Sequence, residues 1–149
     1  MHFEFAIKTD GGGFGGPDNK FQYWIGLFSA SPDGIEFPPL GLQMAAFRFR
    51  PASAAIWQVF GSNDSGFTEG SGSSIAVLPN TEYLLEIKLL STTAEFWIDG
   101  VLYHTLDASQ GDRLPEPSQL LGYGVRVFAF DANAEDRTVR WKRISWDHV

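Results

Sequence analysis

The chain contains no cysteine among its 149 residues. Disulfides, thiolate zinc sites, iron–sulfur clusters and cysteine nucleophiles are therefore excluded. An excess of positive charge is also missing, since 11 basic residues face 18 acidic ones and the net charge is -7. Binding to a phosphate backbone needs a basic surface, so we expect no nucleic acid partner.

Long hydrophobic runs are missing as well. Residues 1–8 alternate between apolar and polar side chains, unlike the apolar run of roughly 7–15 residues in a secretory signal. The apolar stretch at 83–90 is broken by Glu86 and Lys88 and is much shorter than the ~20 residues of a membrane span. We expect no signal peptide and no membrane span. We therefore expect synthesis in a cytosol-like compartment, with virion association as one option. The alternative is that the chain is a piece of a larger protein.

Aromatic residues are abundant, with 13 Phe, 5 Trp and 4 Tyr. Such a chain can bury a core, and its length predicts a single domain over residues 1–149. Short apolar segments separated by turn-forming residues predict an all-β antiparallel sandwich, with a short helical turn near 118–121. Besides the alternating start, the expected strand segments are 22–30, 42–50, 54–60, 75–78, 82–90, 94–99, 101–106, 125–130 and 138–146.

The clearest local pattern is a hairpin over residues 93–106. Asp99-Gly100 supplies the positive φ angles of a type I′ turn, so Ile98 and Val101 should close a two-residue loop. Together with residues 82–90, the hairpin predicts a three-stranded meander. An unbroken register gives the pairs Trp97 with Leu102, Phe96 with Tyr103, Glu95 with His104 and Ala94 with Thr105.

Residues 78–88 (LPNTEYLLEIK) and 94–102 (AEFWIDGVL) resemble the concanavalin A-like lectin/glucanase superfamily, which includes laminin-G-like modules. Residues 139–146 resemble the last strand of such modules, which returns to pair near the first, and 3–8 resemble an early strand. The resemblance implies an antiparallel jelly-roll sandwich of two sheets.

Catalysis lacks a matching motif. Glucanases of this superfamily carry carboxylates at alternate positions of one strand, because retaining cleavage needs two carboxylates roughly 5–5.5 Å apart. The nearest acidic pairs here, Glu82/Glu86 and Glu135/Asp136, are four apart or adjacent. His104 opposite Glu95 could form an acid–base pair, but ordinary cross-strand electrostatics is the simpler interpretation. We therefore expect no enzyme activity.

The candidate ligand-binding residues are aromatic and basic. Trp97, with Glu95 and His104 beside it, is the first candidate platform for the apolar face of a sugar ring, followed by Trp24 and Trp57. The alternative is that these tryptophans fill the core or a subunit interface. Arg140 and Lys142 form a basic stripe suited to an anionic glycan or an acidic neighbour, and a phase shift predicts a bulge near Arg143.

One loop offers oxygen ligands for a metal ion. Asp131, Asn133 and Asp136 could hold calcium, and the alternative is a solvated turn. Apart from calcium at this loop, we expect no cofactor.

The leading hypothesis is a non-catalytic recognition or attachment module that binds a glycan or cell-surface ligand. The alternative is a structural virion protein, in capsid decoration or a tail or fibre, that acts through homo-oligomer or neighbour-subunit contacts. A divergent glycoside hydrolase is the third option.

Overall fold

The computed structural model describes residues 2–8, 21–29, 42–49, 56–71, 75–78, 80–129 and 140–147. These residues form strands and one short 3₁₀ turn. The elements are β1 (His2–Lys8), β2 (Phe21–Ser29), β3 (Met44–Phe49), β4 (Gln58–Asn63), β5 (Gly66–Gly70), β6 (Glu82–Leu89), β7 (Thr93–Ile98), β8 (Val101–Asp107), η1 (Ala108–Gln110), β9 (Leu121–Ala129) and β10 (Arg140–Asp147).

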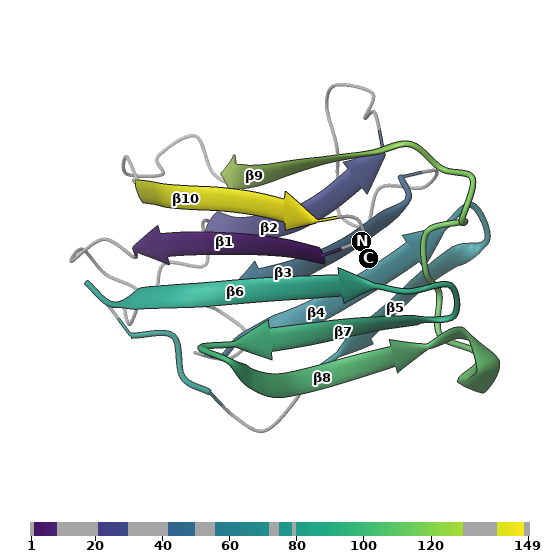
Figure 1. The fold of residues 1–149 in the computed structure, drawn as a ribbon, viewed down its shortest axis with the longest axis horizontal. Coiled ribbons are helices and arrows are strands. Elements are labelled where there is room, and N and C mark those ends of the chain that lie inside the picture. The colour runs from purple at the N-terminus through teal and green to yellow at the C-terminus, as the bar shows by residue number, and fades with distance from the viewer. Residues whose placement is uncertain are drawn as a thin grey trace.

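The strands form two five-stranded antiparallel sheets that stack face to face (Figure 1). Sheet A has the order β10-β1-β6-β7-β8, and sheet B has the order β5-β4-β3-β2-β9. Strand β10 pairs with β1, with Asp147 opposite His2, so the predicted return of the last strand to the first is confirmed. The bulge in this pair falls at Lys142, one residue from the predicted position.

The core lies between the sheets and is built by alternation. In β7, Ala94, Phe96 and Ile98 are buried while the residues between them are partly exposed. Phe96 meets Phe47 of sheet B edge to face, with ring centroids 5.3 Å apart and an interplanar angle of 89°. Burying each such ring contributes about 1.5–3 kcal/mol. These aromatic contacts fix one sheet on the other.

The outer face of sheet B is also buried along its middle strands. A second apolar cluster lies there, separate from the main core, and every residue of β3 is buried. This cluster consists of Trp24, Phe28, Leu42, Met44, Ala46 and Phe60. Because both faces of β3 are buried, its sequence is a nearly continuous apolar run interrupted by Arg48.

The predicted hairpin turn is confirmed. Asp99 and Gly100 have φ angles of 51° and 77°, the positive values that a type I′ turn requires. Asp99 also fixes the turn to β6, since its backbone N–H donates to the Leu84 carbonyl and its Oδ1 accepts from the Leu84 N–H, both at 2.8 Å.

Three elements of the structure differ from the sequence-based prediction. Strand β5 lies where the sequence suggested a turn and loop, because its Gly-Phe-Thr-Glu-Gly run has few apolar residues and forms an exposed edge. Segment 75–78 contributes one isolated bridge, Ala76 with Ile56, instead of a strand. Near 118–121 the chain makes a single turn at 116–119, in which the Gln119 N–H donates to the Glu116 carbonyl at 2.9 Å, and Leu121 begins β9. The short 3₁₀ helix lies instead at Ala108–Gln110, where Asp107 caps it. In the ranges described, no helix has the length and apolarity needed to cross a membrane.

Candidate functional site

Trp97 lies on the outer face of sheet A with charged neighbours. It pairs with Glu86 of β6, and Glu95 pairs with Lys88. The indole Nε1 donates to Glu95 Oε2 at 3.1 Å, and Lys88 Nζ lies 4.0 Å from the ring centroid. Trp97 and Glu95 are therefore together as predicted, but the ammonium group of Lys88 already lies over the ring that a sugar would have to contact.

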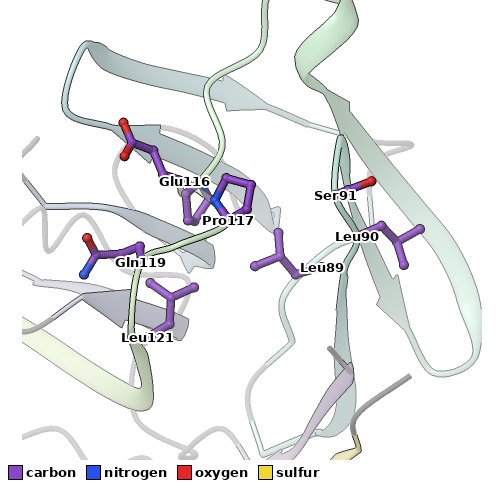
Figure 2. A pocket seen from close by; sticks show the side chains of 8 residues that line it. Leu89, Leu90, Ser91, Glu116, Pro117, Gln119 and Leu121 are labelled. Carbon is purple, nitrogen blue, oxygen red and sulfur yellow. The ribbon is translucent and has the colours of Figure 1, made fainter.

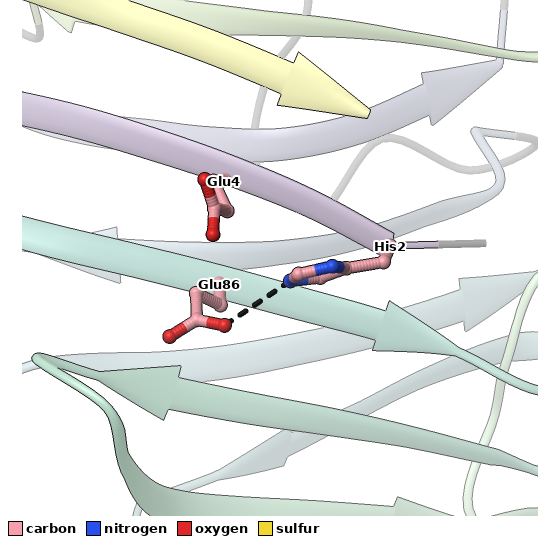
Figure 3. Close-up of side chains that lie close together, drawn as sticks. All are labelled: His2, Glu4 and Glu86. Carbon is pink, nitrogen blue, oxygen red and sulfur yellow. Dashed lines mark hydrogen bonds and ion pairs between the residues drawn. The ribbon is translucent and has the colours of Figure 1, made fainter. Parts of the chain in front are cut away.

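The same face continues toward β1. His2, Glu4 and Glu86 lie close together, with His2 Nε2 3.1 Å from Glu86 Oε2 (Figure 3). The side chains of His2 and Glu86 are 20% and 12% exposed. The outer face of sheet A is thus strongly polar from β1 to β7.

His104 does not lie beside Glu95. The register of β7 and β8 shifts between Trp97 and Phe96, so Phe96 pairs with His104 and Glu95 pairs with Thr105. The extra residue in β8 is Tyr103, whose hydroxyl donates to the Trp57 carbonyl inside the sandwich. The predicted pairing of Glu95 with His104, and of Phe96 with Tyr103, is wrong because a bulge flips the strand.

The bulge allows two apolar residues of β8 to be buried on the same side of the strand. Tyr103 and Leu106 are both buried although they are three residues apart, which a strand of strict period two cannot achieve. His104 consequently faces sheet B, where its Nε2 would lie 2.3 Å from a Cβ placed on Gly70. Glycine at position 70 makes room for this imidazole.

Trp24 and Trp57 are buried, with exposed fractions of 2% and 1%. Trp57 packs edge to face against Tyr83 at 5.6 Å in the main core, and Trp24 packs against Phe60 at 4.8 Å in the second cluster. The expectation that these rings offer a face to a ligand is corrected by their burial. They have the packing role that was the alternative interpretation.

The remaining predicted residues lie near the C-terminus. Asp131, Asn133 and Asp136, the predicted calcium ligands, lie outside the described residues. Arg140 and Lys142 are on β10, at the edge of sheet A, where Arg140 pairs with Lys8 and Lys142 is the bulged residue. The binding role of these residues stays a prediction.

A polar network that the sequence analysis missed lies on the outer face of sheet B. Arg48 of β3, Gln58 of β4 and Glu69 of β5 join three neighbouring strands. Arg48 Nε donates to Gln58 Oε1 at 2.9 Å, and Arg48 Nη2 donates to Glu69 Oε1 at 2.8 Å. Gln58 Nε2 also donates to Glu69 Oε1. Each side chain holds the others in place.

Aromatic rings surround this network. The Arg48 guanidinium carbon lies 4.3 Å from the centroid of Phe60 and 5.6 Å from that of Trp24. Phe60 stacks on Phe67 at 6.1 Å with an interplanar angle of 21°. Phe67 is 46% exposed, and the Glu69 side chain is 37% exposed. The sequence signal for this network is Arg48 itself, a charged residue inside the apolar strand segment 42–50.

A hollow of about 320 Å³ lies between the end of β6 and residues 115–121 (Figure 2). Leu89, Leu90 and Ser91 line one side, and Glu116 and Gln119 lie across from them. No aromatic ring is among its lining residues in the described chain. It therefore lacks the stacking surface that a sugar ring uses.

Comparison with known proteins gives a match in structure alone. No protein-family model matches the chain, and no curated protein sequence matches it. CG-16, a homodimeric agglutinin from chicken liver, superposes with a TM-score of 0.55 at 10% identity, over 97% of this chain and 88% of the agglutinin.

Two further structures are similar. The laminarinase catalytic domain from Thermotoga maritima gives a TM-score of 0.55 at 12% identity, over 94% of this chain and 60% of that domain. The Caenorhabditis elegans galectin LEC-6 gives 0.49 at 12% identity, over 86% and 78%. At these identities the similarity concerns the fold. The chain has the concanavalin A-like jelly-roll fold of two antiparallel sheets, as its hairpin-centred resemblance implied.

Proposed function

We propose that this protein is a non-catalytic, lectin-like module that binds a glycan at the β5 edge of the outer face of sheet B, where Phe67 and Glu69 are exposed beside the buried strand β3. The observation that carries the proposal is the network of Arg48, Gln58 and Glu69 beside the exposed ring of Phe67. A sugar presents apolar C–H faces that stack on an aromatic ring and hydroxyl groups that need fixed hydrogen-bonding partners.

The network is suited to binding because it is already ordered. Arg48 is 4% exposed and is held between Gln58, Glu69 and the face of Phe60, so a ligand does not have to immobilise it. Binding then costs less side-chain entropy than it would on a flexible arginine. Glu69 keeps enough exposure to accept hydrogen bonds from sugar hydroxyls.

The register places Phe67 and Glu69 on the same side of β5, since alternate residues of a strand share a face. Phe60 lies opposite Glu69, and Ser62 lies opposite Phe67. A sugar ring stacked on Phe67 therefore has its hydroxyls within the same surface as the Glu69 carboxylate. The fold shared with an agglutinin supports a recognition role of this kind.

The surface around Trp97 is the rival binding face. There the aromatic ring is partly buried and is covered by Lys88 at 4.0 Å, so a ligand would have to displace the ammonium group first. That displacement forfeits a cation–π contact of about 0.5–1 kcal/mol. Phe67 is 46% exposed and is therefore the more accessible of the two rings, which is why we place the site on sheet B.

A glycan array probed with the folded chain tests the proposal. We expect binding to at least one class of glycan, reduced about tenfold by Phe67→Ala and by Glu69→Gln, and unchanged by Trp97→Ala. Circular dichroism of each variant shows that the fold is kept. Silence of the wild-type protein across neutral and acidic glycans would refute the glycan proposal, and loss with Trp97→Ala alone would move the site to sheet A.

The non-catalytic part of the proposal rests on the carboxylates. In the described strands, none carries acidic residues at alternate positions, and the Glu82/Glu86 pair of β6 is four residues apart. Incubation with β-glucans, including laminarin, should release no reducing sugar. Turnover that disappears in Glu86→Gln or Glu95→Gln would instead establish a divergent glycoside hydrolase.

A second candidate function is structural, in a virion component that is made in a cytosol and acts through protein contacts. Val101 and Leu102 are 63% and 46% exposed on β8, the edge strand of sheet A, and an exposed apolar edge favours pairing with another subunit. Light scattering over a range of concentrations tests it. A dimer weakened by Leu102→Lys supports assembly through this edge, and a monomer at high concentration counts against it.

A further inference from the structure

We propose that His2, Glu4 and Glu86 form a binding site for a divalent cation of the zinc class on the outer face of sheet A. The three side chains project from two neighbouring strands toward one point, as Figure 3 shows. This site lies on the sheet opposite to the proposed glycan face and does not depend on it.

The strand register brings the three ligands together. Glu4 of β1 lies directly opposite Glu86 of β6, and His2 precedes Glu4 by two residues, so it shares the same face. One nitrogen or oxygen of each side chain lies within 4.8 Å of those of the other two. His2 Nε2 and Glu86 Oε2 are 3.1 Å apart.

These separations are close to those of a tetrahedral zinc site. Zinc bonds of about 2.0–2.2 Å to nitrogen and oxygen place two ligand atoms about 3.3–3.5 Å from each other. The His2–Glu86 separation of 3.1 Å is about 0.2 Å shorter than this, and the carboxylate of Glu4, within 4.8 Å of the other two ligand atoms, has to approach them by up to about 1.3 Å.

The donor set selects the class of metal. One imidazole nitrogen and two carboxylate oxygens suit zinc, whereas calcium takes 6–8 oxygen ligands and magnesium prefers an octahedron of oxygens. Three protein ligands leave a fourth position for water. The side chains of His2 and Glu86 are 20% and 12% exposed, so an ion can enter from solvent and remain partly shielded once bound.

The charge arrangement also favours a cation. Two carboxylates directly opposite each other on one face of an antiparallel pair repel. Lys88 pairs with His2, but its side chain extends away from β1 and toward β7, where its Nζ lies over the ring of Trp97. Glu86 already contacts His2, and Glu4 has an interaction of its own. A divalent ion between the two carboxylates would add the attraction of both to a shared charge.

Calorimetric titration of the metal-free, tag-free full chain with zinc chloride tests the proposal. We expect one site per chain with a dissociation constant in the micromolar range or tighter, a rise in Tm on zinc addition, and no heat with calcium chloride. His2→Gln, Glu4→Gln and Glu86→Gln should each weaken zinc binding by at least about tenfold. Glu95→Gln, on the same face but outside the cluster, should leave it unchanged.

Cobalt provides an independent readout of geometry. Co²⁺ bound at this site should give the visible absorption of a four-coordinate ion, and Glu4→Gln should abolish it while the far-ultraviolet circular dichroism is retained. Zinc binding that is absent in the wild-type chain, or that all three cluster variants leave intact, would overturn the proposal. Tight calcium binding in preference to zinc would overturn its assignment to the zinc class.

Discussion

Arg48 Nη2 donates to Glu69 Oε1 at 2.8 Å, so that β3 and β5, which flank β4 in sheet B, are joined across the strand between them. Gln58 of β4 completes the link by accepting from Arg48 and donating to Glu69. A buried guanidinium is costly unless it is paired, and this network pairs it at the surface where Phe67 is exposed. The same contacts thus stabilise the sheet and prepare a binding surface.

The Arg48–Glu69 pair gives the first prediction. Glu69→Gln keeps the shape of the side chain but removes the charge facing Arg48, and we expect the free energy of unfolding in urea to fall by about 1–2 kcal/mol. Glu116→Gln, an exposed acidic position outside the network, should change it by less than about 0.5 kcal/mol. Equal stability of the Glu69 variant and the wild type would show that the pair contributes little.

Gly26 and Gly124 form a matched pair for the second prediction, since they lie directly opposite each other in β2 and β9. A Cβ on Gly26 would lie 2.4 Å from the Ala45 carbonyl oxygen and 2.6 Å from the Ala46 Cα, whereas one on Gly124 meets no atom of the described residues within 4 Å. Gly26→Ala should lower the unfolding free energy by about 2–3 kcal/mol. Gly124→Ala should change it by less than about 0.5 kcal/mol, and similar losses at both positions would contradict the packing of β2 on β3.

The bulge in β8 leads to the third prediction. Because His104 occupies the space beside Gly70, Gly70→Ala should destabilise the protein by about 1–2 kcal/mol. In the double variant Gly70→Ala/His104→Ala the methyl group has room, so we expect a favourable coupling of about 1 kcal/mol in a double-mutant cycle. Strict additivity would mean that His104 lies on the other face, as the unbroken register had predicted.

Asp107 gives a prediction about pH. Hydrogen bonds from the Ser109 side chain and then the Ser109 backbone N–H, with a smaller one from Gln110, hold the pKa of this carboxyl below its ordinary value. A lowered folded-state pKa means that ionised Asp107 stabilises the fold above its unfolded-state pKa of about 3.9, and that this contribution is lost as pH falls through the folded-state value. Carboxyl NMR should show Asp107 titrating below free aspartate, and Ser109→Ala should raise the midpoint. A wild-type midpoint at or above that of free aspartate would contradict this account.

Local patterns predicted much of the fold. The Asp99-Gly100 turn, the meander of β6, β7 and β8, and the return of β10 to β1 follow from alternation and turn chemistry, which act between near neighbours. The register of β8 did not follow, because the bulge depends on Tyr103 reaching the Trp57 carbonyl, 46 residues away. Strand β5 was missed because its pairing with β4, rather than its own hydrophobicity, makes it a strand.

The candidate sites were harder to predict. Trp97 and Glu95 lie together as expected, because positions two apart in a strand share a face. The burial of Trp24 and the network around Arg48 depend on three strands meeting in sheet B, an arrangement that no local pattern in the sequence contains. The cluster of His2, Glu4 and Glu86 could not be predicted for the same reason, because Glu86 is more than 80 residues from His2 and Glu4 along the chain.

The most direct test of the proposed function is an NMR titration of the isotope-labelled chain with a glycan selected from the array, following the backbone amides. The account predicts that the largest chemical-shift changes fall on Arg48, Gln58, Phe67 and Glu69 of sheet B, and that Phe67→Ala raises the glycan concentration needed to reach them about tenfold. Changes centred on Glu86, Glu95 and Trp97 of sheet A, with the sheet B amides unmoved, would contradict it.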